Sequence, residues 1–135
     1  MMSDIEWIVD SLTTLKNHGI KIALDDFGTG YSSLNQLQAL HLDTLKIDRS
    51  FISRIDDESV SSKSITATIA SIAEIYGLET VAEGIETEQQ LAEVRRLGIS
   101  VAQGYYYSKP VKTEDVADVI ASIDQLATVV TKKAA

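Results

Sequence analysis

Polar side chains recur at the ends of apolar segments in this sequence, and most of them are carboxylates, which can bind divalent cations or accept protons from water. Such segments occur at 21–27, 43–48, 80–86 and 100–105. The polar residues at or near their ends are Asp25, Asp26, Lys46, Asp48, Glu83, Glu86 and Gln103. The carboxyl ends of parallel strands meet at one edge of a sheet, where α/β folds place their chemistry. We therefore expect these side chains to form one site.

Asp25 and Asp26 form an adjacent carboxylate pair at the end of the first apolar segment. Neighbouring like charges raise each other's pKa values, and a bound divalent cation relieves the repulsion. Oxygen ligands suit Mg²⁺ or Mn²⁺. Taken alone, the pair is also compatible with a solvated acidic turn.

Lys46 lies inside the second apolar segment, where an amine is costly to bury unless it points into a polar site or pairs with an acid. An ion pair with Asp48 or Glu83 is therefore the alternative to a functional role. Glu83 and Glu86 flank Gly84 at the end of the third segment. Either carboxylate could bind a metal or take a proton from water.

A glycine-containing turn follows the first segment, and such turns before a helix can bind phosphate through free backbone N–H groups. Its residues include Gly28, Thr29, Gly30, Tyr31 and Ser32. The turn matches neither the Walker pattern nor the dinucleotide fingerprint, so a simple turn and helix cap explains it equally well.

The end of the fourth segment carries three tyrosines, Tyr105–Tyr107, which could lie at a rim, in the core or against a base. Pro110 follows them and is expected to fix a loop. His18 and His41 lie at predicted helix ends away from the acidic residues, so we interpret them as structural.

Strands and helices alternate along the chain. Strands are predicted at about 20–25, 43–48, 78–83 and 100–105. Helices are predicted from Ser3 to before Gly19, at about 32–40 and 59–76, after a Thr87–Gln90 capping box, and from near Thr113. Strands joined through helices run parallel with right-handed crossovers. The predicted fold class is α/β, with four strand-helix units, which is half of the eight that close a barrel.

The bulk properties predict one globular domain over residues 1–135. Hydrophobic residues make up 44% and charged residues 24%, which is ordinary for such a domain. The net charge of −8 argues against binding of a nucleic acid polymer through a basic surface. The absence of cysteine, of a secretory leader and of a bilayer-length apolar run predicts a cytoplasmic protein without membrane insertion.

Four motifs in order resemble the C-terminal half of the EAL domain, the bacterial cyclic di-GMP phosphodiesterase family of signalling hydrolases. They are DDFGTGYSSL at 25–34, LKIDRSF at 45–51, VAEGIE at 81–86 and QGY at 103–105, with Lys109-Pro110. The resemblance covers nearly the whole chain. It implies a modified TIM barrel in which two divalent ions activate a water that opens the cyclic dinucleotide to linear pGpG.

Carried over by motif, the resemblance implies roles for individual residues. Asp25 and Asp26 are expected to bind metal, Mg²⁺ or Mn²⁺, and Glu83 is the candidate general base. Metal or water contacts are implied for Lys46, Asp48, Glu86 and Gln103. The loop at 27–34 resembles one that supports metal binding and dimer contacts.

The EAL signature with its metal-binding Glu, and the later Asn and Glu ligands, belong to the first half of the family's barrel, and no segment of this sequence supplies them. We therefore expect a truncated domain that is not a competent phosphodiesterase as a monomer. An open four-strand sheet would expose two edges and an apolar barrel-facing side. A homodimer that completes or covers the half-barrel is the predicted solution.

Three functions from different classes follow from these expectations. The first is a receptor module that retains divalent-metal or weak cyclic di-GMP binding. The second is an active Mg²⁺- or Mn²⁺-dependent phosphodiesterase, formed when a dimer or a partner completes the barrel. The third is a non-catalytic interaction domain whose motifs are relics.

Overall fold

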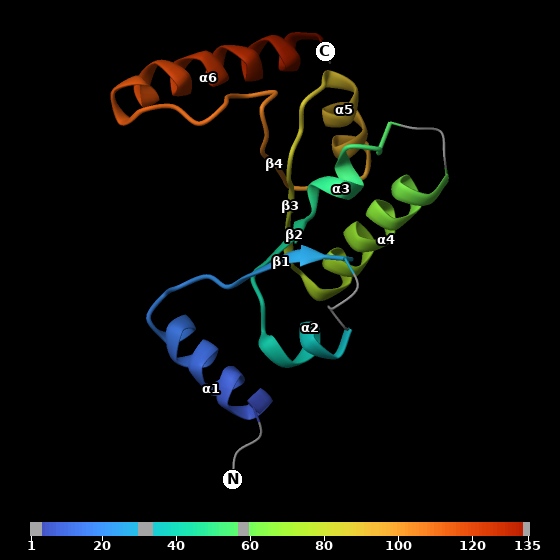
Figure 1. The fold of residues 1–135 in the computed structure, drawn as a ribbon, viewed down its shortest axis with the longest axis vertical. Helices are drawn as coiled ribbons and strands as arrows, with labels where there is room; N and C mark the ends of the chain where they lie inside the picture. Colours follow the sequence, from blue (N-terminus) through green and yellow to red (C-terminus); the bar gives the residue numbers. More distant parts are fainter. Residues whose placement is uncertain (1–3, 30–33, 57–59, 134–135) are drawn as a thin grey trace.

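The computed structural model describes residues 4–29, 34–56 and 60–133. Helices and strands alternate along most of the chain (Figure 1). Their order is α1 (Asp4–Asn17), β1 (Ala23–Phe27), α2 (Leu34–Leu40), β2 (Thr44–Ile47), α3 (Arg49–Ile52), α4 (Val60–Tyr76), β3 (Glu79–Ala82), α5 (Glu88–Arg96), β4 (Val101–Ala102), a 3₁₀ turn η1 (Thr113–Asp115) and α6 (Val116–Lys133).

The strands form one parallel sheet in the order β1-β2-β3-β4, which confirms the predicted α/β fold class. Strand bounds differ from the prediction at both edges. β1 begins at Ala23 and continues through the two aspartates to Phe27, with a register shift between Leu24 and Phe27. β4 contains only Val101 and Ala102. It ends early because the backbone turns at Gly104, where an added Cβ would lie 2.1 Å from the carbonyl oxygen of Ile85.

The start of β2 anchors the segment that leads into β1. Asp43 accepts hydrogen bonds from the Ile22 backbone N–H at 2.8 Å and from Lys16 Nζ at 2.8 Å. The Lys16 ammonium, followed by the Ile22 N–H, lowers the pKa of Asp43 below its ordinary value. Asp43 therefore connects α1, the residue before β1 and the start of β2. These contacts help to set the register at which β1 enters the sheet.

The predicted helices are present where the structure describes them. The capping box before α5 is confirmed, since Thr87 Oγ1 accepts from the Gln90 N–H at 3.1 Å and Gln90 Oε1 accepts from the Thr87 N–H at 3.2 Å. α3 was not predicted, because four residues are too few to show a helical period.

The hydrophobic core lies between one face of the sheet and the helices that cover it. Leu45 and Ile47 of β2 and Ala82 of β3 are completely buried there. The helices and the segments beside them contribute Leu37, Ile52, Ile55, Ile69, Ile85, Leu91 and Val94. This layer of apolar side chains is the two-layer core that a half-covered sheet requires.

The other face of the sheet is mixed in polarity, so the prediction of an apolar barrel-facing side is wrong. Burial alternates along β2 and β3, as expected for strands whose side chains point to opposite faces. The less buried, alternating positions of the four strands and of the residues just after them are Ala23, Asp25, Thr44, Lys46, Glu79, Val81, Glu83, Val101 and Gln103. Only three of these are apolar, and four of the polar ones, Asp25, Lys46, Glu83 and Gln103, lie toward the carboxyl ends, so that edge can hold a polar site.

α1 and α6 lie at opposite ends of the molecule, away from the sheet (Figure 1). Both carry exposed apolar side chains, among them Trp7 with 65% and Ile120 with 55% of its surface exposed. None of the described helices is both long enough and apolar enough to cross a membrane.

Candidate functional site

Asp25 and Asp26 lie at the register shift of β1, and both side chains are exposed. Asp25 Oδ1 accepts a hydrogen bond from the Asp26 backbone N–H at 3.0 Å. Asp26 has a φ of +52°, in the left-handed region that a non-glycine residue enters only at a cost of about 1 kcal/mol. This backbone bend lets two successive residues of one strand present their carboxylates to the same side of the sheet.

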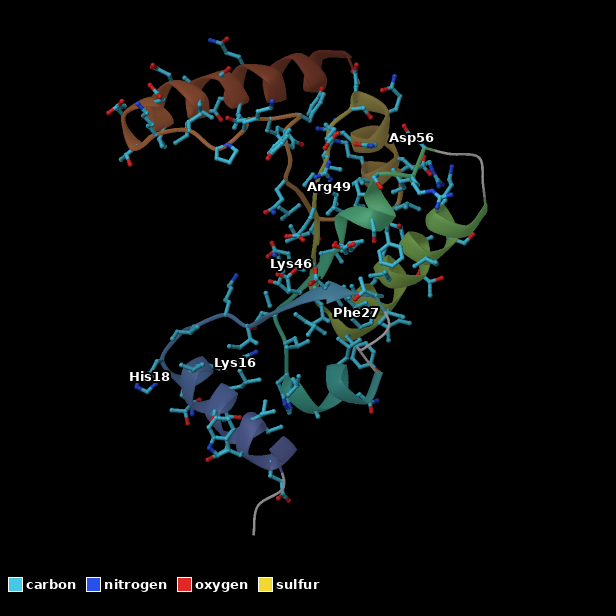
Figure 2. All side chains as sticks on the ribbon, in the orientation of Figure 1. Lys16, His18, Phe27, Lys46, Arg49 and Asp56 are labelled. Carbon is cyan, nitrogen blue, oxygen red and sulfur yellow. The ribbon has the colours of Figure 1, made fainter. Side chains whose placement is uncertain are left out.

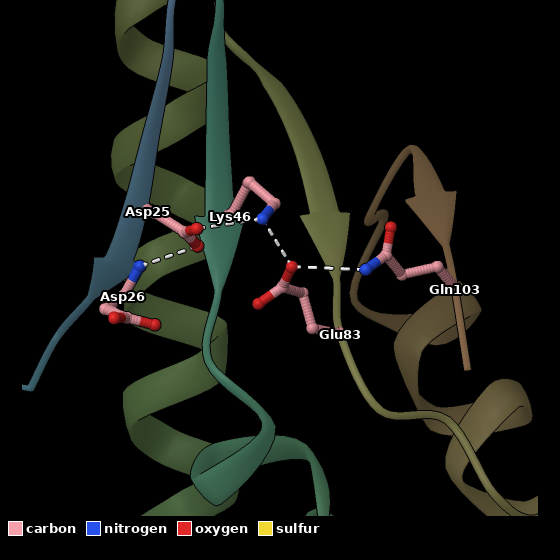
Figure 3. Close-up of polar contacts among 5 residues, drawn as sticks. All are labelled: Asp25, Asp26, Lys46, Glu83 and Gln103. Atoms are coloured by element: carbon pink, nitrogen blue, oxygen red, sulfur yellow. Dashed lines mark hydrogen bonds and ion pairs between the residues drawn. The ribbon is translucent and has the colours of Figure 1, made fainter. Parts of the chain in front are cut away.

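Lys46 of β2 lies between two of the carboxylates (Figure 3). Its Nζ donates to Asp25 Oδ2 at 3.0 Å and to Glu83 Oε1 at 2.5 Å. The hydrogen bond with Glu83, followed by that with Asp25, raises the pKa of the Lys46 ammonium above its ordinary value. Of the two ion pairs considered from the sequence, the one with Glu83 is present.

Gln103 extends this group to the fourth strand. Its Nε2 donates to Glu83 Oε1 at 3.2 Å, so this oxygen accepts from both Gln103 and Lys46. Figure 3 shows Asp25, Lys46, Glu83 and Gln103 in a row across the carboxyl edge of the sheet, with α4 behind the strands. We call Asp25, Asp26, Lys46, Glu83 and Gln103 the acidic cluster.

The donor set of the acidic cluster fits a small divalent cation. Asp25, Asp26 and Glu83 each offer an oxygen atom, and these atoms all lie within 4.8 Å of one another. Carboxylate oxygens are the ligands that Mg²⁺ and Mn²⁺ prefer. Because the Lys46 ammonium already contacts two of these carboxylates, a metal ion would share them with it.

Asp48 and Glu86 lie beside the acidic cluster and have other partners. Asp48 caps α3 and accepts from the Ser50 N–H at 2.9 Å. Hydrogen bonds from Ser50 are the main cause that lowers the pKa of Asp48, and the Asp26 side chain adds a smaller effect. Glu86 Oε1 accepts from Arg49 Nη2 at 2.5 Å. Their roles as metal ligands stay predictions.

Arg49 is a polar residue of this edge that the sequence interpretation missed. It follows Asp48 directly and begins α3. The available signal was a cation placed next to the polar end of a strand in a region rich in carboxylates. The rule that places strand ends together applies to the residue after the strand as well as to the last residue in it.

The glycine-containing turn is described only in part. Thr29 donates to the Asp26 carbonyl oxygen through its N–H at 3.3 Å and through Oγ1 at 2.9 Å, as in a simple turn. Gly28 lies against Phe51 and Ile69, where an added Cβ would be 3.0 and 3.1 Å from their side chains. Gly30, Tyr31 and Ser32 lie outside the described residues, so phosphate binding by this loop stays a prediction.

The tyrosines after β4 have different environments. Tyr106 and Tyr107 pack against the core, with their rings edge to face at 5.4 Å. Tyr105 is exposed, and Lys109 Nζ lies 5.6 Å from its ring centroid. Pro110 is exposed in the segment that leads to η1.

Neither histidine lies near the acidic cluster. His18 directly follows α1 and lies well apart from Lys46 (Figure 2), and its Nδ1 lies 2.8 Å from the Thr14 carbonyl oxygen. His41 Nδ1 lies 3.2 Å from the Ala39 carbonyl oxygen, before the amino end of β2. Contacts with backbone carbonyls agree with the structural interpretation of both residues.

The pockets of the described region differ in their chemistry. A pocket of about 280 Å³ and one of about 370 Å³ lie toward the amino ends of the strands, and Leu78 lines both. A smaller pocket of about 190 Å³ adjoins the acidic cluster through Gln103. Size does not identify the site here, because the smallest of these three pockets is the one at the edge where the acidic and amide side chains gather.

The comparison with protein families decides the identity of the domain. The family model described as "EAL domain" matches residues 1–110. The chain belongs to the EAL domain family. The resemblance carried by the motifs at the strand ends is thereby confirmed, and the sheet that holds the acidic cluster is part of an EAL fold.

Similar proteins and structures support the same family. The chain is 41% identical to Probable cyclic di-GMP phosphodiesterase PdeG of Escherichia coli (strain K12), over 93% of this chain and 24% of PdeG. The crystal structure of the EAL domain of Mycobacterium smegmatis DcpA is 41% identical with a TM-score of 0.81, over 89% of this chain and 53% of that chain. The Klebsiella pneumoniae BlrP1 manganese/cy-diGMP complex at pH 9.0 is 33% identical with a TM-score of 0.68, over 79% of this chain and 29% of that chain.

The chain thus spans about a quarter of PdeG and about half of the DcpA chain. The similar structures are TIM-barrel EAL domains, and the four parallel strands described here correspond to part of such a barrel. The EAL-family identity covers the acidic cluster, since every member of the cluster lies within residues 1–110.

Proposed function

We propose that this EAL-family chain binds a divalent cation and, together with it, cyclic di-GMP, and that its 135 residues alone do not hydrolyse the dinucleotide. One observation carries the proposal: Asp25, Asp26 and Glu83 offer three carboxylate oxygens within 4.8 Å of one another at the carboxyl edge of the sheet. A solvated acidic turn would not need a third carboxylate from another strand.

Asp25, Asp26 and Glu83 would hold the cation, which we expect to be Mg²⁺ or Mn²⁺. A bound ion of this kind offsets phosphate charge and polarises phosphoryl oxygens. Lys46 and Gln103 hold Glu83 in place from both sides, through contacts of 2.5 and 3.2 Å to its Oε1. Fixed carboxylates favour cation binding because less conformational entropy is lost when the ligands are already in position.

Relatives support cyclic di-GMP as the ligand. PdeG is named as a probable cyclic di-GMP phosphodiesterase, and the BlrP1 structure is a manganese/cy-diGMP complex. The net charge of −8 also favours a mode of binding in which metal ions offset the phosphates, since few cations are available to do so.

Hydrolysis would need more ligands than this cluster provides. Two-metal catalysis holds ions about 3.5–4 Å apart on the attacking and leaving oxygens. The acidic cluster supplies three carboxylates on one side, and the Glu and Asn ligands expected from the family's first half are not in this sequence. A misplacement of ~1 Å can lower the rate roughly 100-fold.

The second candidate is an active phosphodiesterase, completed by a second copy or by a partner that supplies the missing strands. Glu83 would then accept a proton at Oε2, an atom for which the described region provides no hydrogen-bond partner. Formation of linear pGpG with Mn²⁺ would establish this function. The third candidate, an interaction domain with relic motifs, predicts that Asp25→Ala changes stability alone.

The predicted homodimer also stays a proposal. It is supported by the unpaired outer edges of β1 and β4 and by the exposed apolar side chains of α1 and α6. A cytoplasmic location is likewise a prediction from the sequence.

Calorimetric titration with cyclic di-GMP in the presence of Ca²⁺ tests the proposed function, with nucleotide products analysed afterwards. We expect binding to the parent chain, loss of binding in Asp25→Ala and unchanged binding in Asp10→Ala, a matched exposed aspartate on α1. Equal binding by all three proteins, or binding by none, would contradict the proposal. Accumulation of pGpG would favour the second candidate.

A further inference from the structure

We infer that Arg49 contacts a phosphate oxygen of the bound dinucleotide directly, beside the metal site. The inference rests on the proposed binding of cyclic di-GMP and adds a residue that recognises the ligand without a metal ion. It is carried by three features of Arg49: the support of its stem, the donors of its guanidinium that remain available, and the pocket that it lines.

The stem of Arg49 lies directly on the backbone of Gly84, in the segment that follows β3. A Cβ atom added at Gly84 would lie 2.4 Å from Arg49 Cγ and 2.8 Å from Cδ. Gly84 also has a φ of +75°, which favours glycine at this position. Because Gly84 has no side chain, the stem of Arg49 can pass over its backbone and reach the pocket.

The guanidinium of Arg49 is held at one end and available at the other. Nη2 donates to Glu86 Oε1 at 2.5 Å, while 62% of the Arg49 side chain is exposed. A guanidinium has five N–H donors. Within the described parts of the chain this ion pair is the one contact found for the Arg49 head group, so most of its donors can meet an anionic oxygen.

The pocket beside Arg49 has the composition expected of a phosphate subsite. It has a volume of about 190 Å³ and is lined by Arg49, Gly84, Glu86, Gln103, Gly104 and Tyr105. This volume would accommodate a phosphate group or one base but not a whole dinucleotide. Gln103 also donates to Glu83, so the pocket is continuous with the acidic cluster.

Arg49 suits this contact better than Lys46 does. Lys46 is already bound to Asp25 and Glu83 and is only 25% exposed. Each phosphodiester of the dinucleotide carries a negative charge, and the carboxylates around the pocket repel it. Arg presents a planar fork that can donate two hydrogen bonds to one phosphate group, which would offset this repulsion.

The test is calorimetric titration of cyclic di-GMP in Ca²⁺ with Arg49→Gln, Arg49→Lys and the control Arg54→Gln, an exposed arginine outside the pocket. We expect Arg49→Gln to weaken binding about tenfold or more, since charge-assisted hydrogen bonds contribute about 1.5–3 kcal/mol. Arg49→Lys should recover part of the loss, and Arg54→Gln should match the parent. Titration with Ca²⁺ alone should be unchanged in all three variants.

A double variant separates contact with phosphate from simple neutralisation of Glu86. Arg49→Gln leaves the Glu86 carboxylate unpaired, and its repulsion alone could weaken binding. In Arg49→Gln with Glu86→Gln the repulsion is removed, so, with Ca²⁺ binding equal to that of the parent, affinity for the dinucleotide should stay low if Arg49 touches the ligand. Recovery of the parent affinity in the double variant would overturn the inference, as would parent affinity in Arg49→Gln.

The two proposals can fail separately. If the parent binds the dinucleotide and loses it in Asp25→Ala but not in Arg49→Gln, the proposed function stands and the Arg49 contact is wrong. If the parent binds Ca²⁺ but no dinucleotide, both the proposed ligand and its contact with Arg49 are rejected.

Discussion

At the scale of single residues, Lys46 is an internal cation in a group of carboxylates. Its ammonium contacts Asp25 and Glu83, and these two acids together with Asp26 are the ones that could bind a metal ion. The ammonium therefore offsets part of the repulsion that a divalent cation would otherwise offset. Without metal, Lys46 stabilises the cluster; a bound metal ion would share Asp25 and Glu83 with it.

Replacement of Lys46 by methionine tests this balance. Without metal, Lys46→Met should lower the free energy of unfolding by about 1 kcal/mol, a magnitude typical of a solvent-accessible ion pair. The three carboxylates then depend more on a divalent cation, so Mn²⁺ should raise the melting temperature of the variant more than that of the parent. Thermal unfolding with and without Mn²⁺ measures both effects, and an equal Mn²⁺ shift in the two proteins would show that Lys46 does not offset the cluster's charge.

The acidic cluster was predictable from sequence because parallel strands bring their carboxyl ends to one edge. Asp25, Lys46, Glu83 and Gln103 come from four different strand ends and meet as expected. The left-handed backbone of Asp26 was not predictable, since aspartate adopts this conformation only where the surrounding structure imposes it. The pairing of Arg49 with Glu86 depends on the space above Gly84, which no spacing rule reveals.

At the scale of elements, the segment between β3 and α5 determines how the pocket is formed. Its backbone contacts the segment after β4, where the Ile85 N–H donates to the Gln103 carbonyl oxygen at 3.0 Å and the Tyr106 N–H donates to the Ile85 carbonyl oxygen at 2.9 Å. Arg49 of α3 closes the other side over Gly84. Three separate segments thus fix one wall of the proposed site.

Alanine substitutions at two glycines can separate steric contact from backbone strain. Gly84 and Gly98 have nearly the same φ, +75° and +74°, but only Gly84 has a neighbour within 4 Å of an added Cβ. Both variants bear the strain of roughly 1–2 kcal/mol expected for a left-handed alanine. Gly84→Ala should therefore destabilise the protein more than Gly98→Ala in urea unfolding.

Arg49→Ala should remove the extra destabilisation in Gly84→Ala, because it deletes the side chain that the new methyl group would strike. Equal destabilisation by Gly84→Ala and Gly98→Ala would show that Arg49 moves away freely and does not depend on the Gly84 backbone for its position.

An ion-pair network between α4 and α5 should make stability depend on pH. Glu93 contacts Arg96 at 2.6 Å and Lys63 at 2.7 Å, and these partners, Arg96 first, lower the pKa of Glu93 to about 2. Because the folded-state pKa lies below the unfolded value, the stabilisation is complete above the unfolded pKa of about 4.5 and is lost as the pH falls toward 2.

Glu93→Gln should lower the free energy of unfolding by about 1 kcal/mol at pH 7, a modest value because both cations are largely exposed and screened. The difference from the parent should shrink between pH 4.5 and pH 3, whereas the control Glu74→Gln on α4 should show no such trend. Urea unfolding across this range measures it, and a difference that stays constant with pH would exclude the network as its source.

The elements themselves were predictable to different degrees. α4 and α5 were predictable because an apolar period, a capping box and a terminal glycine agree with one another. The polarity of the uncovered sheet face was predicted wrongly, because this face was expected to be the apolar lining of a barrel, although Lys46 and Glu83 lie on it. Strands that line a site on one face replace apolar residues at alternate positions, a pattern that four-residue strands show only weakly.

At the scale of the whole molecule, the described chain is a sheet covered on one face, with two peripheral helices (Figure 1). Exposed Trp7, Ile8 and Leu15 on α1 and exposed Val116 and Ile120 on α6 show that these helices are not fully packed. Large apolar side chains in this number are typical of surfaces that contact further protein. The match with the DcpA EAL domain covers 89% of this chain and 53% of that chain, which agrees with a barrel only partly present here.

The 135-residue chain expressed alone is predicted to form a homodimer, because a second copy can pair with the outer strand edges and cover apolar surface. Sedimentation velocity at micromolar concentration should give twice the mass of 14.7 kDa. A folded monomer at that concentration would show that a second copy does not complete the barrel. The acidic cluster would then have only the ligands of one chain.

Binding of Mn²⁺ to the acidic cluster is the most direct test of the central claim. Electron paramagnetic resonance of free Mn²⁺ should show binding to the parent chain and loss of binding in Asp26→Asn, since asparagine tolerates the left-handed conformation of Asp26 while removing a ligand charge. Asp10→Asn on α1 should bind as the parent does. Equal Mn²⁺ binding by the parent and Asp26→Asn, with both folded, would show that Asp25, Asp26 and Glu83 are not a metal site.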